Sequence, residues 1–375
     1  MKHQLASKLS ELHLRLPKLL SEFHVPGVSY AVYEQDTIYS FSAGNSDAQM
    51  ARNVDEETLF HACSMSKLVT SLIVLKLVEQ GVLDLDTPVN DYLKGWSLGL
   101  HESLISSGMD NNAPDVTLIH LLNHSSGILD HDSAFGPLEH GDSVPSILEI
   151  LSGMTSYNPQ PIQVQTQVGS DFSYSDAGFC VIEKLLCDVT GKTFNELAHT
   201  LIFNPLALPL STFRYANEFN QKQSSTCAED DLSNIACGHN KAGELILQQR
   251  ATYPYLASAG LWTTAKELCQ LLLSVSQAIK GEGSLGIPPH LMARMINPEG
   301  AEDWAGLGVF VQKENELTQI FSMGWGLGFQ CKLVSNLTQG YGIVVLTNSD
   351  PGCDQNSALS GKLISELKEI LMTSS

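Results

Sequence analysis

The strongest constraint on the fold is a serine and a lysine placed at the start of a long apolar segment. Residues 60–67 read Phe-His-Ala-Cys-Ser-Met-Ser-Lys, and a largely apolar run follows over residues 68–78. Because residues three apart share one face of a helix, Ser64 and Lys67 are expected one turn apart on the same side. The middle of the run, residues 72–75, is apolar on every side, which predicts a buried central helix ending at Gly81.

This pair has the chemistry of acyl transfer. A serine hydroxyl is a weak nucleophile at neutral pH, and an adjacent amine can accept its proton. The N–H groups and the dipole at the amino end of a helix favour negative charge that develops there. Ser64 and Lys67 therefore match the Ser-x-x-Lys arrangement of serine acyl-transfer enzymes, although four residues alone are a weak signal. Cys63 has no partner base in this pattern, so we interpret it as a packing residue.

Composition limits the kinds of partner. The chain has 375 residues, 43% of them hydrophobic and 17% charged, which predicts a globular protein with a large core. The net charge of −20 argues against a binder of nucleic acid or anionic lipid. The chain lacks the run of about 18 apolar residues that a membrane span requires. The eight cysteines form no Cys-x-x-Cys pair and favour buried thiols in a reducing compartment.

The amino-terminal segment predicts an amphipathic helix rather than a secretory signal. Leucines recur at helical spacing from Leu5 to Leu20 among charged residues, with Pro17 expected to kink or start the helix. We expect a cytoplasmic protein from the sequence as it stands, or a periplasmic or secreted one if a leader has been removed.

The order of patterns predicts an α+β fold, an α/β sandwich. Two β-rich runs, 27–34 and 37–43, follow the first helix, and three more (306–312, 328–334 and 341–347) lie near the carboxyl end. We therefore expect one antiparallel sheet of five or more strands built from both chain ends and flanked by helices. Residues 1–75 and 250–375 would form this sheet subdomain, and residues 76–249 a mostly helical one, with the active site between them.

Helix signals are clear at several places. Residues 116–123 and 176–190 are expected to be helical, the latter closed by Gly191, and a final amphipathic helix follows residue 358. Thr264 and Glu267 fit a capping box that opens a helix through Leu273.

Five segments then occur in a characteristic order. They are Leu-Phe (59–60) with Ser-Met-Ser-Lys (64–67), Gly-Val-Leu-Asp-Leu-Asp-Thr-Pro-Val (81–89), Leu-Leu-Asn-His-Ser-Ser-Gly-Ile (121–128), Phe-Ser-Tyr-Ser-Asp (172–176) and Ala-Gly-Leu-Trp-Thr-Thr-Ala (259–265). Together they resemble the serine β-lactamase and penicillin-binding-protein-like superfamily, closest to class C β-lactamase-like hydrolases and esterases. The resemblance covers nearly the whole chain and implies the β-lactamase/transpeptidase-like fold.

The resemblance implies three catalytic residues. Ser64 would be the acylated nucleophile, Lys67 the neighbouring amine, and Tyr174 the phenol that moves a proton between them and the leaving group. A tyrosine titrates near 10 in water, and a nearby ammonium favours its phenolate. The backbone N–H groups of Ser64 and Trp325 would form the oxyanion hole.

Two positions depart from the family pattern. Asp176 stands where asparagine is usual; its carboxylate would keep Lys67 protonated and leave Tyr174 as the base, or it would merely cap the following helix. Aligning Gly324 and Trp325 with the Lys-Thr-Gly or His-x-Gly strand places Ser322 where a cation normally binds a substrate carboxylate. Serine carries no charge, so carboxylate recognition should weaken. Ser322, Met323 and Gly324, with Asp176, are the expected substrate-binding or supporting residues.

We therefore predict a serine hydrolase that acts on an ester or small amide through an acyl-enzyme. The alternatives are a β-lactamase or D-amino-acid peptidase, and a catalytically silent relative that binds a ligand or partner. We expect no cofactor and no metal, since His120 and His124 lack a third ligand nearby, and a small-molecule substrate. The sequence does not indicate an oligomeric state.

Overall fold

The computed structural model describes residues 2–50, 52–106, 115–131, 134–139, 141–216, 234–314 and 317–373. Its main element is a seven-stranded antiparallel sheet in the order β3-β2-β1-β12-β11-β10-β9. These strands are β1 (Gly27–Glu34), β2 (Thr37–Asp47), β3 (Arg52–Asn53), β9 (Phe310–Glu314), β10 (Leu317–Gly326), β11 (Phe329–Asn336) and β12 (Tyr341–Thr347). Short strands form two smaller sheets: β4 (Phe60–His61), β5 (Gly99–Leu100), β6 (Gln163–Val164), β7 (Thr212–Phe213) and β8 (Leu261–Thr263).

The sheet joins the two ends of the chain, as the sequence predicted. Strand β1 pairs antiparallel with β12, with Val32 opposite Ile343. The first late strand differs from the prediction, because β9 begins at Phe310 and not at residue 306. Gly308 takes a φ of +69°, a left-handed conformation that ends extended structure, so residues 306–309 form a loop. This loop faces the candidate site.

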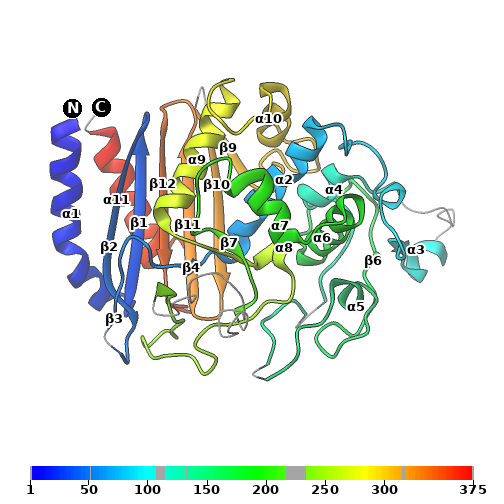
Figure 1. The fold of residues 1–375 in the computed structure, drawn as a ribbon, viewed down its shortest axis with the longest axis horizontal. Coiled ribbons are helices and arrows are strands. Elements are labelled where there is room, and N and C mark those ends of the chain that lie inside the picture. The colour runs from blue at the N-terminus through cyan, green and yellow to red at the C-terminus, as the bar shows by residue number, and fades with distance from the viewer. Residues whose placement is uncertain are drawn as a thin grey trace.

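The α-helices of the described residues cover the sheet and build a second, mostly helical half of the molecule. They are α1 (Lys2–Glu22), α2 (Ser66–Glu79), α3 (Glu102–Ser106), α4 (Leu118–Leu122), α5 (Ile147–Leu151), α6 (Asp176–Thr190), α7 (Phe194–Ala198), α8 (Leu256–Ala259), α9 (Ala265–Ile279), α10 (Pro289–Ile296) and α11 (Leu359–Met372). Helices α1 and α11 lie side by side on one face and α9 on the other, while α3 to α7 build the opposite half of the molecule (Figure 1).

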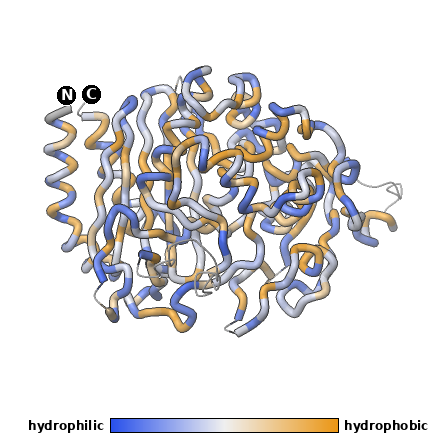
Figure 2. Tube along the Cα trace, viewed as in Figure 1, coloured by the Kyte–Doolittle hydropathy of each residue, from blue (hydrophilic) through white to orange (hydrophobic). Residues whose placement is uncertain are grey.

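Alternation along β1 explains the layers. Tyr30 and Val32 pack into the core beneath α1 and α11, whereas Ala31 and Tyr33 point into the larger core shared with α2 and α9. Helix α1 buries its leucine stripe but leaves Leu14 80% exposed, and its hydropathy alternates along its length (Figure 2). The helix begins at Lys2 and continues through Pro17, so the proline does not start it.

Helix α2 is buried along most of its length, as its apolar sequence predicted. Helix α6 begins and ends where expected, with Ser175 as its N-cap and Gly191 in a left-handed conformation after it. The capping box at Thr264 is only half confirmed. The hydroxyl of Thr264 accepts from the Glu267 N–H at 3.1 Å, but the Glu267 carboxylate accepts from the N–H groups of Leu210 and Ser211. The Glu267 side chain therefore binds N–H groups of a loop that is distant in sequence, instead of the N–H of the N-cap residue.

The described cysteines are all free thiols, five of them buried, while Cys227 lies outside the described residues. Within the described ranges, no helix is both long enough and apolar enough to cross a membrane.

Candidate active site

A tight turn presents Ser64. Strand β4 leads into a 3₁₀ turn, Cys63–Met65, and α2 follows from Ser66. Cys63 has a φ of +49°, which non-glycine residues rarely adopt and which costs energy. Its buried thiol lies 3.2 Å from Nδ1 of His61, and burial raises its pKa well above the usual value. Cys63 therefore stays protonated and packs beneath the turn, as interpreted from sequence, while Ser64 stands above it.

Lys67 is fixed by three oxygens. Its Nζ donates to the Ser64 Oγ at 3.3 Å, to the Asp176 Oδ1 at 2.6 Å and to the backbone carbonyl of Ser258 at 3.3 Å. The lysine side chain is only 3% exposed. Burial alone would lower its pKa, but the charge of Asp176, with a smaller contribution from Tyr174, raises it above the ordinary value. Lys67 is therefore an ammonium at neutral pH, as expected from the presence of Asp176 in the sequence.

Asp176 is the first residue of α6, and its carboxyl group is ionised. Burial would raise the pKa of this carboxyl, but the Lys67 ammonium and hydrogen bonds from Lys67 and Ser258 bring it below the ordinary value. The Ser258 hydroxyl donates to the same Oδ1 that binds Lys67. Ser258 is fully buried on α8 and was missed from sequence, since nothing in its local pattern distinguishes it from a packing residue.

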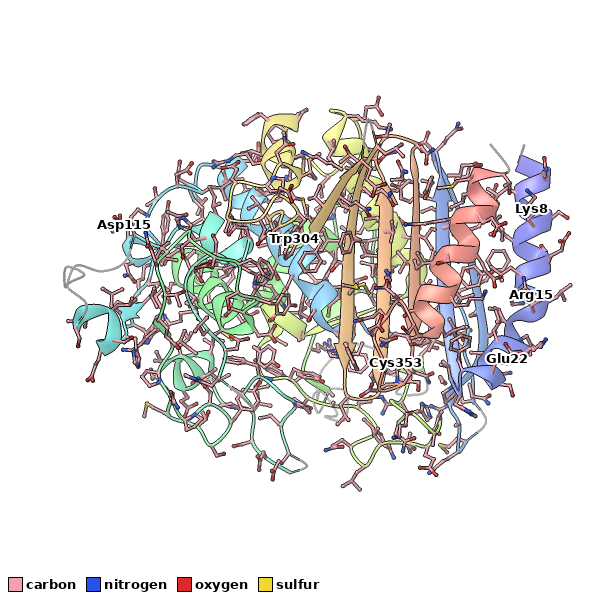
Figure 3. The ribbon with its side chains drawn as sticks, turned by 180° about the vertical axis from the view of Figure 1, so that it is seen from behind. Lys8, Arg15, Glu22, Asp115, Trp304 and Cys353 are labelled. Atoms are coloured by element: carbon pink, nitrogen blue, oxygen red, sulfur yellow. The ribbon has the colours of Figure 1, made fainter. Side chains whose placement is uncertain are left out.

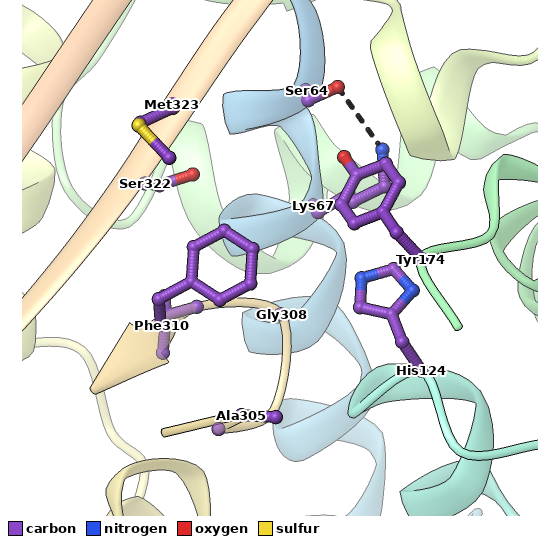
Figure 4. Close-up of a pocket in the computed structure, with 11 residues that line it drawn as sticks. Ser64, Lys67, His124, Tyr174, Ala305, Gly308, Phe310, Ser322 and Met323 are labelled. Atoms are coloured by element: carbon purple, nitrogen blue, oxygen red, sulfur yellow. Dashed lines mark hydrogen bonds between the residues drawn. The ribbon is translucent and has the colours of Figure 1, made fainter. Parts of the chain in front are cut away.

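Tyr174 completes the group. Figure 4 shows its hydroxyl pointing toward Ser64 and Lys67, and the Lys67 Nζ lies 4.7 Å from the centre of its ring. The Tyr174 pKa is raised, because burial outweighs the Lys67 charge and the hydrogen bonding from Lys67 and Ser64 that lower it, and Asp176 raises it further. The ammonium thus favours the phenolate as expected, but the phenol is the resting form at neutral pH.

His124 and Asp130 support Tyr174 and α6 from below. The His124 ring stacks on Tyr174 at a centroid distance of 4.4 Å, and its Nδ1 accepts from the Ser175 N–H at 3.1 Å. Burial, with the Lys67 charge, lowers the His124 pKa to about 3, so this ring is neutral. Asp130 accepts from the Ser175 hydroxyl and from the N–H groups of Asp176 and Ala177.

Asp130 was not among the residues found from sequence. Asp130 holds the first turn of α6 although it lies 46 residues before that helix in the sequence. A capping residue so far from its helix cannot be found from local sequence patterns. Burial and the nearby Asp176 raise its pKa to about 6.

Strand β10 forms the opposite wall. Strand β9 pairs with it only over residues 317–321, so residues 322–326 lie beyond that pairing, next to the Ser64 turn. Gly324 allows this approach, because a Cβ there would lie 2.3 Å from the carbonyl oxygen of Ala62. Trp325 is 46% exposed, and its indole N–H donates to Asp350 at 2.8 Å. The strand therefore brings the predicted oxyanion segment beside the nucleophile.

A cavity lies between these walls (Figure 4). Its lining includes most of the predicted residues and an apolar loop: Ser64, Lys67, His124, Tyr174, Ala305, Gly306, Gly308, Val309, Phe310, Ser322 and Met323. Gly324, Trp325 and Asp176 flank the lining and are not part of it. Ser322 occupies the expected position and brings no charge, so Lys67 is the one cation in the lining, and Asp176 neutralises it.

No cluster of three or more His, Cys, Asp or Glu side chains able to hold a metal occurs among the described residues. His120 and His124, which lie four residues apart in the sequence, have other contacts. Nδ1 of His120 accepts from the Thr117 N–H, which starts α4, and His124 supports Tyr174.

The fold and the arrangement of this site are those of the β-lactamase and penicillin-binding-protein superfamily. The Beta-lactamase family model matches residues 15–361, and the chain belongs to that family. It is similar to esterase EstB of Burkholderia gladioli, with 31% identity over 86% of this chain and 79% of that protein. It is also similar to penicillin-binding protein 4 of Amycolatopsis lactamdurans, with 25% identity over 52% of this chain and 46% of that protein.

The chain thus spans less than half of the penicillin-binding protein that it matches. Among solved structures, the octameric penicillin-binding protein homologue from Pyrococcus abyssi superposes with a TM-score of 0.73 at 21% identity, over 98% of this chain and 78% of that one. At this identity the superposition supports the fold.

Proposed function

We propose that the protein hydrolyses uncharged esters, or small amides, through an acyl-enzyme on Ser64. The observation that carries this proposal is the convergence of a hydroxyl, an ammonium and a phenol on one cavity whose far wall offers Ser322 instead of a cation. A substrate carboxylate would find no free positive partner in that lining, because Asp176 already pairs with Lys67.

The proposed chemistry uses Tyr174 as the proton carrier. In its ionised form the phenol accepts the proton of Ser64 while Oγ attacks the substrate carbonyl, and it then donates that proton to the leaving oxygen. Lys67 stays protonated throughout and stabilises the phenolate. The backbone N–H groups of Ser64 and Trp325 would hold the oxyanion. Water then attacks the acyl-serine by the reverse proton path and releases the acid, so no cofactor is needed.

The site would lie between the two proposed subdomains. Ser64 and Lys67 come from residues 1–75, Tyr174 and Asp176 from residues 76–249, and the β10 wall from residues 250–375. A small-molecule substrate would bind at this junction, which is a common place for such sites.

One labelling experiment tests the proposal. The protein is incubated separately with a fluorophosphonate and with a fluorescent penicillin, and intact mass is compared with that of Ser64→Ala. We expect an adduct from the phosphonate only, absent in the variant, together with turnover of p-nitrophenyl acetate.

Adducts from both probes would instead favour the β-lactamase or D-amino-acid peptidase alternative. No adduct from either probe, with no ester turnover, would overturn the proposal and favour a relative that only binds.

A further inference from the structure

A chain of aromatic rings runs around the cavity from Tyr174 to Phe310, the first residue of β9. The ring centroids are 4.4 Å apart for Tyr174 and His124, 5.5 Å for His124 and Phe172, 4.5 Å for Phe172 and Trp304, and 5.8 Å for Trp304 and Phe310. We call these five residues the aromatic arc. Three of them, Tyr174, His124 and Phe310, line the cavity itself.

The arc joins elements that are distant in sequence. Figure 4 shows Phe310 on one side of the cavity and the stacked Tyr174 and His124 on the other, with Ala305 at the end away from Ser64. Trp304 lies between the sheet and the helical half of the molecule (Figure 3). The arc therefore starts at the proposed proton carrier and curves around the cavity to its opposite wall.

Two rings of the arc keep a large exposed fraction. Trp304 is 36% exposed and Tyr174 is 38% exposed, although both lie against other rings. Large aromatic side chains stabilise a fold most when they are buried. The exposed faces of these two rings instead leave apolar surface for a ligand near the nucleophile, while His124 is only 5% exposed.

The size and charge of the cavity narrow the choice of ligand. The enclosed space measures about 20 Å³, room for about one water molecule, so a larger group must lie at the open side against the rings. The loop residues between Trp304 and Phe310 that line the cavity, Ala305, Gly306, Gly308 and Val309, add no charge. An aromatic group that stacks on the arc is favoured over a charged or strongly polar one.

We propose that the aromatic arc binds an uncharged aromatic group of the substrate, with Phe310 as its contact in the cavity lining and Trp304, whose ring touches Phe310, beside it. This inference rests on the proposed ester hydrolysis and adds the substrate class to it. Stacked or edge-to-face aromatic pairs contribute enough for about a tenfold preference over a saturated ring of similar size.

The test compares aromatic and saturated esters of matched shape. In the first series p-nitrophenyl phenylacetate is compared with p-nitrophenyl cyclohexylacetate, which varies the acyl group. In the second, benzyl butyrate is compared with cyclohexylmethyl butyrate, which varies the alcohol. The readout is the ratio of kcat/KM for the aromatic and the saturated member, measured for the native protein, Trp304→Ala and Phe310→Leu.

We expect a ratio of about ten in one series, which identifies the side of the ester that meets the arc, and a fall toward one in both variants. Phe310→Leu keeps apolar bulk and removes the ring, so the ratio remains measurable if Trp304→Ala folds poorly. Phe41→Ala is the matched control, because this half-buried ring packs under α1, away from the cavity. It should leave the ratio unchanged.

Two outcomes would overturn the inference. One is a ratio near one in both series for the native protein, and the other is a native preference that neither variant reduces. Both leave the proposed function intact, since esters are still hydrolysed. Absence of hydrolysis for every ester, with Ser64 unlabelled by a fluorophosphonate, marks failure of the proposed function itself.

Discussion

Replacing Asp176 with asparagine tests how the site controls its protons. Asp176 raises the pKa of both Lys67 and Tyr174, and in the native protein burial holds the Tyr174 pKa above its ordinary value. If the phenolate is the base, kcat/KM of the native enzyme should rise with pH until that group ionises. Asp176→Asn removes the negative charge and keeps an oxygen that can accept from Lys67. The rising limb should therefore move to lower pH.

The size of this shift follows from the geometry. Lys67 Nζ lies 2.6 Å from Asp176 Oδ1 and 4.7 Å from the centre of the Tyr174 ring, so the carboxylate charge lies near the phenol on the other side of this lysine. Charges about 7 Å apart interact by about 2 kcal/mol at an effective dielectric constant of about 20. Since one pKa unit is about 1.4 kcal/mol, that energy is equivalent to about two units. Part of the charge effect is screened by solvent at the open cavity, so we expect the limb to move by about one to two pH units.

The assay is kcat/KM for p-nitrophenyl acetate between about pH 6 and 11, after subtraction of spontaneous hydrolysis. Ser258→Ala is the matched control, because it removes a hydrogen bond to Asp176 but leaves every charge in place. Its limb should move by less than about half a unit. A limb that stays at the native pH in Asp176→Asn, or moves upward, would refute the reasoning. A native profile that is flat above about pH 8 would show that the base is not Tyr174.

Three more predictions follow from the structure. Gly324→Ala should lower kcat at least about tenfold, because its Cβ would meet the Ala62 carbonyl and push β10 away from the nucleophile. Gly99→Ala is the control, since a Cβ there lies in open space and kcat should not change. Steady-state kinetics of both variants measure the difference. Burial raises the Glu183 pKa from 4.5 to about 7. Its contribution to the free energy of unfolding is therefore fully present below about pH 4.5, and about 3 kcal/mol of it is lost as the pH rises through 7. Thermal melts should therefore show Tm falling between pH 5 and 8, and less so in Glu183→Gln; equal slopes would contradict the assignment. Ser322→Lys should raise kcat/KM for succinate monoesters relative to butyrate esters by about tenfold or more, and an unchanged ratio would place carboxylate recognition elsewhere.

Local signals were enough to predict much of the fold. The N-cap Ser175 and the glycine at 191 bound α6 at both ends, and apolar runs predicted the strands that meet at the sheet centre. These signals work because capping and strand patterning are decided by neighbours in sequence. The Glu267 side chain shows where such reasoning fails, since its partners at residues 210 and 211 are brought near only by the folded chain.

The candidate site also contains residues that the sequence predicted and residues that only the structure revealed. The resemblance to known motifs led to Ser64, Lys67 and Tyr174, and the structure brings all three to one cavity. Asp130 and Ser258 carry no motif, yet they hold the first turn of α6 and the carboxylate of Asp176. Their roles come from burial and from contacts across 46 and 82 residues, which a single sequence does not reveal.

The pairing of β1 with β12 has a consequence for biosynthesis. The strand that follows α1 cannot gain its second neighbour until residues 341–347 have left the ribosome, and the wall beside Ser64 needs residues 322–326. Contacts so distant in sequence form slowly, and a growing chain leaves apolar surface uncovered meanwhile. The nascent protein should therefore stay inert until residues 322–347 have emerged and paired.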